Sequence, residues 1–263
     1  MATISRRRIG PLMVSAAGTP DGYPLLFLHG IGSAGVAFDP QLAHFGDSRW
    51  CLSPDAPGYA QSDDDPAIAS LSDFVDHYIA LLDTLEVERA DLLGLSWGGV
   101  IVTKLAADHP DRVARLILVD TSRGSGINPE KAAGMLARGA AFEAEGAETF
   151  AKGRTPRLLA ADASAELADR VASTMAAAIR LPGYRQAVAS MAETDNTDAL
   201  RSIAAPTLVI VGTEDQVCPP AESETIAELV PNAALRFIER AGHLTNQEQP
   251  ERFNQVLDEF LAG

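Results

Sequence analysis

Residues 94–99 are Gly-Leu-Ser-Trp-Gly-Gly and carry the pattern G-x-S-x-G. The mostly apolar residues 91–95 predict a short buried strand, and residues 100–109 predict a helix that ends before Pro110. A serine between a strand and a helix occupies a strained turn that exposes its hydroxyl, and the flanking glycines leave room for that turn. The stretch therefore predicts that Ser96 is a nucleophile at the end of a buried strand.

The composition is that of a globular protein with a large core. The chain has 263 residues, of which 46% are hydrophobic and 22% charged. No stretch approaches the roughly 18 uninterrupted apolar residues typical of a membrane-spanning helix. Three arginines, at positions 6–8, are followed by a segment that Gly10 and Pro11 break, so it lacks the apolar core of a signal peptide.

Two cysteines, Cys51 and Cys218, lie far apart and match no metal-binding or redox spacing. We expect both to be small buried core residues. This cysteine usage favours a location in the reducing cytoplasm.

The formal net charge of −15 argues against nucleic acid or an anionic membrane as a partner. The charge is unevenly distributed. Residues 122–200 contain nine Lys or Arg and ten Asp or Glu, whereas the rest of the chain contains twelve and twenty-six. If residues 122–200 cover the site, an anionic substrate meets a nearly neutral cover. The sequence leaves the oligomeric state open, a homo-oligomer included.

Short apolar runs bounded by turn residues recur along the chain and predict strands. They cover residues 25–28, 50–52, 92–95, 116–119, 208–211 and 235–238. Helical patterns lie between them, for example over residues 71–85. This alternation predicts an α/β fold with a mostly parallel sheet and helices on both faces. Residues 4–9 and 12–16 predict an antiparallel hairpin at its edge.

Residues 122–200 interrupt this alternation, because they contain helical patterns but no convincing strand. Glycines and prolines divide them into several short helices, at positions 124, 126, 129, 156, 182 and 183. We expect a helical cap, residues 122–200, that covers the strand ends. Residues 1–121 and 201–263 then form the two parts of one core domain.

A serine nucleophile needs a base and an acid that orients the base. His243 is the predicted base, because it lies in a loop of small residues between a strand and the helical residues 250–261. We expect that loop to be accessible at the surface. Asp215 is the leading acid, because it follows the strand 208–211. Asp120, at the end of strand 116–119, is the main alternative, and the adjacent Glu214 is disfavoured.

The negative charge of a tetrahedral intermediate requires backbone N–H donors that already point at it. One is expected at Trp97, immediately after the nucleophile, and one at Ile31, in the glycine-rich loop after strand 25–28. Gly30 allows that loop to approach a substrate, and His29 is expected to brace it by hydrogen bonding. The Trp97 side chain lines the acyl pocket or packs beneath the cap, and these two alternatives stay open.

Several short motifs occur in one order along the chain: 29–30 (His-Gly), 55–62 (Asp-x-Pro-Gly-x-x-x-Ser), 94–99, 212–215 (Gly-x-x-Asp) and 242–243 (Gly-His). In this order the chain resembles the α/β-hydrolase superfamily over nearly its whole length. Segments 183–184, 205–210 and 241–250 resemble those of 3-oxoadipate enol-lactonases and related enzymes. The resemblance implies an eight-stranded sheet, a helical cap, a nucleophilic serine and no cofactor or metal. Trp97 stands where many of these enzymes carry methionine.

The residues favour a serine hydrolase that cleaves a small carboxylic ester or lactone through an acyl-enzyme. One alternative is hydrolysis of a carbon–carbon bond in a diketone-like ring-cleavage product. Another is a receptor-like protein that binds its ligand with little turnover. The cap arginines at 123, 138, 154 and 157 are candidates to bind a substrate carboxylate, although solvated helix faces are the more frequent role of such residues.

Overall fold

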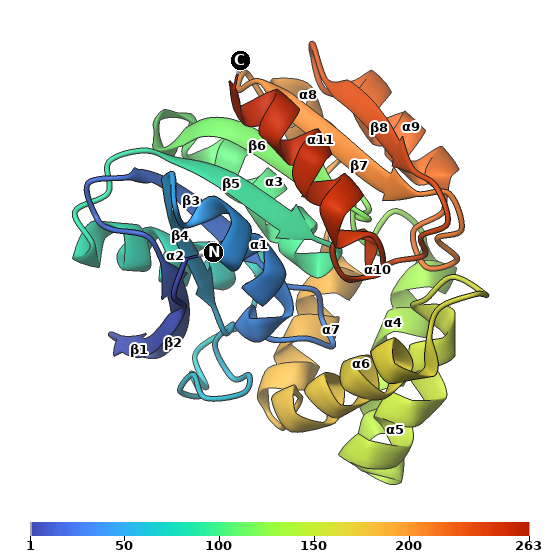
Figure 1. The fold of residues 1–263 in the computed structure, drawn as a ribbon. Coiled ribbons are helices and arrows are strands. Elements are labelled where there is room, and N and C mark those ends of the chain that lie inside the picture. Colours follow the sequence, from blue (N-terminus) through green and yellow to red (C-terminus); the bar gives the residue numbers. More distant parts are fainter. Residues whose placement is uncertain (1, 263) are drawn as a thin grey trace.

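A central sheet of eight strands forms the core of the computed structural model, which describes residues 2–262 (Figure 1). The strand order is β1-β2-β4-β3-β5-β6-β7-β8. Strands β1 and β2 form an antiparallel hairpin, β2 pairs antiparallel with β4, and the remaining neighbours are parallel. The strands are β1 (Ser5–Ile9), β2 (Leu12–Ala17), β3 (Tyr23–Leu28), β4 (Arg49–Pro54), β5 (Ala90–Leu95), β6 (Val113–Val119), β7 (Thr207–Gly212) and β8 (Ala234–Ile238).

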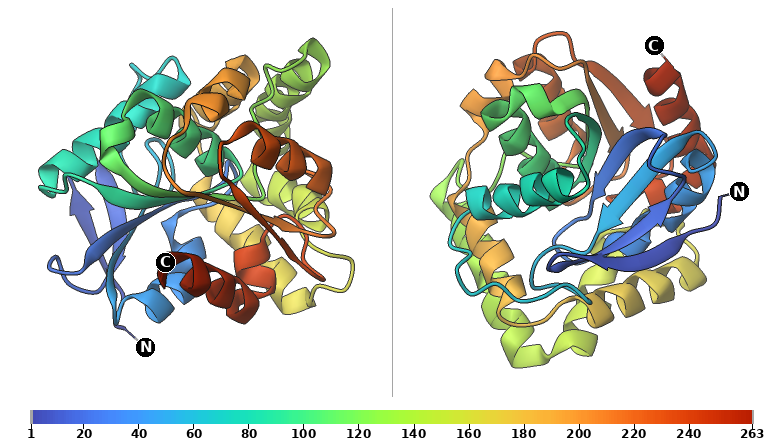
Figure 2. Two further views of the ribbon diagram at one scale, coloured as in Figure 1. Left: turned by 90° about the horizontal axis from the view of Figure 1, so that it is seen from above. Right: turned by 90° about the vertical axis from the view of Figure 1, so that its left-hand side faces the viewer.

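Helices cover both faces of the sheet, as the alternating pattern predicted. Helices α1 and α11 lie on one face, and α2, α3 and α9 lie on the other (Figure 2). The core helices are α1 (Asp39–Phe45), α2 (Leu71–Thr84), α3 (Trp97–Asp108), α8 (Thr197–Ser202), α9 (Pro220–Leu229), α10 (Thr245–Glu248) and α11 (Pro250–Ala262). Short 3-10 turns are η1 (Gly35–Phe38), η2 (Pro110–Arg112) and η3 (Thr155–Arg157). Every residue of β5 and of β7 is buried, which explains why these strands are continuous apolar runs.

The cap helices between β6 and β7 lie together at one end of the sheet (Figure 1). They are α4 (Pro129–Glu145), α5 (Ala147–Arg154), α6 (Ala165–Ala178) and α7 (Gly183–Glu193). Helix α8 contacts the core helices α3 and α9, so the expected boundary after residue 200 falls inside a helix that packs on the core. Gly146, with a φ of 76°, separates α4 from α5, a break that the sequence analysis did not identify.

The two cysteines are free and buried, as expected. Across residues 2–262, no helix combines the length and the apolar character that crossing a membrane requires.

Candidate active site

Ser96 occupies the turn between β5 and α3, with a φ of 55° and a ψ of −118°. This left-handed conformation is strained for a residue with a side chain, and the surrounding glycines make it feasible. A Cβ atom at Gly94 would lie 2.3 Å from the carbonyl oxygen of Gly98, and one at Gly98 would lie 2.1 Å from that of Leu28. Only glycine fits at either position, so the motif at 94–98 is a packing requirement of the turn itself.

Ser96, His243 and Asp215 form one hydrogen-bonded chain, although up to 147 residues separate them in sequence. The Oγ of Ser96 lies 2.9 Å from Nε2 of His243, and Nδ1 of His243 lies 2.8 Å from Oδ2 of Asp215. Asp215 accepts at its other oxygen from the backbone N–H groups of Val217 and Cys218, at 2.7 and 2.9 Å. An ionised Asp215 fixes the proton of the imidazole on Nδ1, so Nε2 is free to accept the proton of Ser96.

The loop that carries His243 is buried, so the expectation of an accessible loop is wrong. The N–H of His243 donates to the carbonyl of Leu158 at 2.9 Å, which places the segment after α5 directly over the loop. Glu248 accepts from the N–H of Gly242 at 2.9 Å and from that of Ala160 at 2.7 Å. The loop is buried because the cap covers it, a long-range contact that small loop residues do not reveal.

Asp120, the alternative acid, points elsewhere. Its two oxygens accept from the N–H of Gly212 at 3.0 Å and from the N–H and hydroxyl of Thr245 at 3.1 and 2.7 Å. It therefore joins the end of β7 to the start of α10, whereas Asp215 contacts the imidazole. Glu214 faces away and lies 3.3 Å from the N–H of Ala161.

Burial and the two carboxyl groups set the electrostatics of this site. Burial acts to lower the pKa of His243, but the charge and hydrogen bond of Asp215, with a contribution from Asp120, raise it above 6.5 overall. Burial, together with the nearby Asp215, raises the pKa of Asp120 to about 7. The imidazole is thus a stronger base than an ordinary histidine, and Asp120 is a weaker acid than an ordinary aspartic acid.

The backbone amides of Trp97 and Ile31, the two expected oxyanion donors, lie near Ser96. Trp97 is the first residue of α3, where N–H groups lack intrahelical acceptors. Ile31 lies in the loop after β3, whose Gly30 approaches Ser96 so closely that a Cβ there would lie 3.2 Å from the Cβ of the serine. Within the described chain, neither amide donates to another group. Both are therefore available to an oxygen atom bound at Ser96.

A small cavity of about 40 Å³ opens at Ser96. Apolar side chains of the cap form its roof. The residues that line it are Gly30, Ile31, Gly32, Ser33, Leu95, Ser96, Leu158, Val171, Thr174, Met175, His243, Leu244 and Gln247. The space suits a small acyl group.

The side chains of His29 and Trp97 do not line this cavity, although Gly30 does. The indole N–H of Trp97 donates to the Oγ of Ser190 at 3.1 Å, and its ring packs against Phe74. His29 accepts from the N–H of Ala56 at Nε2, so its Nδ1–H donates to the carbonyl of Gly30 at 2.8 Å. Both side chains are buried beneath the site, where they support its backbone rather than face a ligand.

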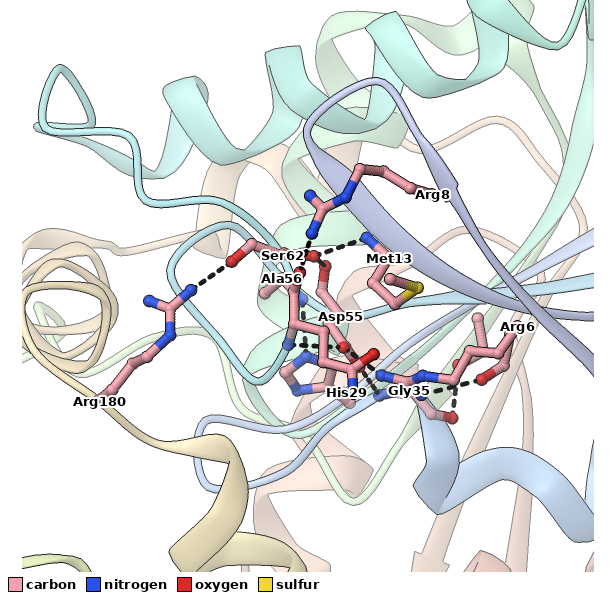
Figure 3. A network of polar contacts seen from close by, with 12 residues as sticks. Arg6, Arg8, Met13, His29, Gly35, Asp55, Ala56, Ser62 and Arg180 are labelled. Carbon is pink, nitrogen blue, oxygen red and sulfur yellow. Dashed lines mark hydrogen bonds and ion pairs between the residues drawn. The ribbon is translucent and has the colours of Figure 1, made fainter.

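Asp55 is the centre of a polar network that supports this part of the site (Figure 3). It is fully buried, pairs with Arg6 of the hairpin and accepts from the N–H of Gly35 at 2.9 Å. Arg180, between α6 and α7, bonds the carbonyl of Ser62 and that of Gly58. The motif at 55–62 thereby joins the hairpin, the loop after β3 and the cap.

Tyr59 links the same motif to the loop that carries the Ile31 amide. Its ring is fully buried against those of His29 and Trp97, and its hydroxyl donates to the carbonyl of Ile31 at 2.8 Å. Tyr59 gives no signal in the sequence, because nothing in the sequence indicates a contact across 28 residues.

The candidate cap arginines differ in their surroundings. Arg123 forms a two-pronged ion pair with Glu222 of α9, at 2.9 and 3.2 Å, so it has a protein partner already. Arg157 is exposed. Arg138 and Arg154 each keep a buried Nε that no described residue accepts from.

The sheet order and the serine turn after β5 define the alpha/beta hydrolase class of proteins. The chain belongs to the alpha/beta hydrolase fold family, whose model matches residues 23–250. Its relatives are named hydrolases, and the protein is a hydrolase.

Similar proteins fall into more than one hydrolase type. The chain is 34% identical to a 2-hydroxymuconate semialdehyde hydrolase of Pseudomonas sp. (strain CF600), over 92% of this chain and 87% of the relative. It is 27% identical to 3-oxoadipate enol-lactonase 2 of Acinetobacter baylyi, over 93% and 90%. The solved structure of a thermophilic esterase from Thermogutta terrifontis (malate bound) matches with a TM-score of 0.84 and 28% identity, over 99% and 98%.

Proposed function

We propose that the protein hydrolyses a small carboxylic ester or lactone at Ser96 through an acyl-enzyme. The observation that carries this proposal is the hydrogen-bonded chain from Ser96 through His243 to Asp215, with two unengaged amides beside the serine. Acyl transfer by a serine enzyme requires a hydroxyl nucleophile, a base in the correct tautomer and amide donors for the oxyanion.

In this mechanism Ser96 attacks the carbonyl carbon while Nε2 of His243 takes the hydroxyl proton. The N–H groups of Ile31 and Trp97 stabilise the oxyanion of the tetrahedral intermediate. His243 then gives the proton to the leaving alcohol oxygen, which leaves an acyl-enzyme. The same imidazole activates a water that attacks the acyl carbon, and the carboxylic acid departs as Ser96 regains its proton.

The size of the cavity favours a small substrate. A volume of about 40 Å³ is far below the 300–1,000 Å³ of typical drug-sized ligand sites. A lactone suits a compact site, because ring opening leaves the alcohol attached to the acyl group and no separate leaving group needs a second pocket.

Hydrolysis of a carbon–carbon bond in a diketone-like ring-cleavage product is the second candidate function. The observation that favours it is the 34% identity to a 2-hydroxymuconate semialdehyde hydrolase. The two functions share the fold and differ in the bond that breaks.

A turnover screen tests these proposals. Purified protein is assayed against enol-lactones, simple esters and vinylogous diketones, with Ser96→Ala as the control. Saturable turnover of esters or lactones alone supports the first proposal, and turnover of the diketones alone replaces it with the second. Protein that becomes acylated without turning over supports the receptor-like alternative.

The pH dependence of turnover follows from the pKa of His243. The base acts in its neutral form, and Asp215 raises the pKa of His243 above 6.5. On a neutral ester, kcat/KM should therefore rise with pH and reach half its plateau above pH 6.5. An NMR titration of the imidazole in Ser96→Ala should give a matching value. A half-plateau point below 6.5 would contradict the predicted influence of Asp215.

Tyr59→Phe tests whether the Ile31 amide takes part. The change keeps the buried ring and removes only the 2.8 Å hydrogen bond to the Ile31 carbonyl. Because a loosened donor stabilises the transition state less well, we expect kcat to fall about tenfold with KM little changed. Tyr78→Phe, which alters a buried tyrosine of α2, is the control. A change in KM alone would assign Tyr59 to substrate binding instead.

A further inference from the structure

Three polar groups of the cap are buried without an acceptor. Within residues 2–262, the Nε atoms of Arg138 and Arg154 and the hydroxyl of Tyr184 are buried and have no hydrogen-bond partner. Tyr184 is fully buried as a residue. Buried polar groups in folded proteins are nearly always hydrogen-bonded, because an unpaired one loses its interactions with water and gains none. Three such donors from neighbouring helices indicate an acceptor that the chain does not itself supply.

Arg138, Arg154 and Tyr184 form one cluster on the inner side of the cap helices. Arg138 lies on α4, Arg154 ends α5 and Tyr184 lies on α7. The rings of Phe142, Phe150 and Tyr184 pack edge-on in a triangle, with centroids 5.0 to 5.7 Å apart. The guanidinium of Arg154 lies 5.9 Å from the ring centre of Phe150. Aromatic packing therefore positions Arg154 and Tyr184, while a terminal guanidinium nitrogen of Arg138 donates to the Sδ of Met135 at 3.3 Å.

The cluster carries positive charge that no protein acid balances. In the described chain no aspartate or glutamate forms an ion pair with Arg138 or Arg154, whereas Arg123 pairs with Glu222. Burial, reinforced by the neighbouring Arg138, lowers the pKa of Arg154 to about 10. Arg154 is still protonated at neutral pH. Both arginines are partly buried, and an anion stabilises positive charge in such a place.

One hydrogen bond and two electrostatic interactions relate the cluster to the proposed site of hydrolysis. The carbonyl of Leu158, four residues after Arg154, accepts the N–H of His243. Burial and then the neighbouring Tyr184 raise the pKa of Tyr59, the residue that holds the Ile31 carbonyl. Burial and, more weakly, the charge of Arg138 act to lower the pKa of His243, although Asp215 and Asp120 together raise it overall. The cluster is therefore near enough to the catalytic residues to act on their charges, although its three side chains do not line the small cavity at Ser96.

We propose that Arg138, Arg154 and Tyr184 bind a carboxylate of the substrate, on its acyl part and away from the carbonyl that Ser96 attacks. The substrate is then an anionic ester or lactone, and the inference rests on the proposed hydrolysis at Ser96. A carboxylate offers two oxygens to guanidinium and hydroxyl donors, in charge-assisted hydrogen bonds. A local positive cluster also offsets the repulsion that the net charge of −15 exerts on an anion.

A matched pair of substrates tests the proposal. Mono-p-nitrophenyl glutarate has a free carboxylate at the far end of its acyl chain, and its methyl ester has the same chain without the charge. We expect the protein to prefer the acid. Arg154→Gln and Arg138→Gln should each lower kcat/KM on the acid about ten- to hundredfold and leave the methyl ester within about twofold. Tyr184→Phe should give a smaller loss with the same selectivity.

Arg170→Gln is the matched control, because Arg170 is an exposed arginine of the cap helix α6. This substitution should leave unchanged the ratio of kcat/KM on the acid to kcat/KM on the methyl ester. The methyl ester also reports folding, since a misfolded variant loses activity on both substrates. Equal turnover of acid and methyl ester by the unmodified protein, or parallel losses in the variants, would overturn the carboxylate site.

Binding of glutarate to Ser96→Ala separates this inference from the proposed function. Glutarate should raise the Tm of Ser96→Ala, and adding Arg154→Gln should abolish the rise. That result supports the carboxylate site even where neither ester is hydrolysed, in which case only the proposed function fails. No rise in Tm with saturating glutarate would overturn the carboxylate site.

Discussion

Ser96→Ala is expected to abolish the burst of p-nitrophenol from p-nitrophenyl acetate and to lower kcat by about ten-thousandfold to a millionfold. The alanine lacks the hydroxyl that lies 2.9 Å from Nε2 of His243, so no acyl-enzyme forms. The turn should persist, because alanine accepts the φ of 55° about as readily as serine does. Stopped-flow measurement of the burst, with circular dichroism as a check of folding, gives the result.

Ser33→Ala provides the matched control for this experiment. Ser33 also lines the cavity, but no base contacts its hydroxyl in the described structure. Its removal should leave the burst intact. A burst that survives in Ser96→Ala and disappears in Ser33→Ala would transfer the nucleophile to Ser33 and refute the mechanism.

Asp215→Asn is expected to lower kcat about ten-thousandfold. An asparagine can present its amide N–H to Nδ1 of His243, which stabilises the tautomer with the proton on Nε2. That nitrogen then cannot accept the proton of Ser96. Steady-state kinetics on a neutral ester, with thermal unfolding as a check of the fold, measures the loss.

Asp120→Asn is the comparison that identifies the acid. Asp120 bonds Gly212 and Thr245 and has a pKa raised to about 7, so a neutral amide resembles its protonated form. We expect a kcat within about tenfold of the unmodified protein. Nearly full activity in Asp215→Asn together with a large loss in Asp120→Asn would assign the role to Asp120.

Much of the fold follows from local sequence. Strands buried on both faces are continuous apolar runs, which makes β5 and β7 recognisable, whereas the edge strand β8 is recognisable from its apolar residues although two of its residues are exposed. Strand and helix ends are less well defined locally, so β6 begins at Val113 and α3 at Trp97, three residues earlier in each case than the apolar patterns indicate. Within the cap, breaks at proline were recognisable, whereas the break at Gly146 was not, since a lone glycine also occurs inside helices.

The sequence by itself determined the serine turn, the candidate base and the place of both at the carboxyl ends of parallel strands. The glycines at 94 and 98 admit no side chain, and the order of serine, acid and histidine accords with the fold. Those features depend on neighbours along the chain, so local pattern is enough to find them.

Only the tertiary structure decided which groups meet. Asp120 follows β6, and Asp215 follows the adjacent parallel strand β7. The sequence does not locally encode the directions of their side chains, and in the structure it is Asp215 that contacts His243. Glu222 pairs with Arg123 from 99 residues away, whereas Arg138 and Arg154 form no ion pair with an acid among residues 2–262. The physical reason is that hydrogen bonds and ion pairs depend on distance in space, and folding brings residues far apart in the chain within 3 Å of each other.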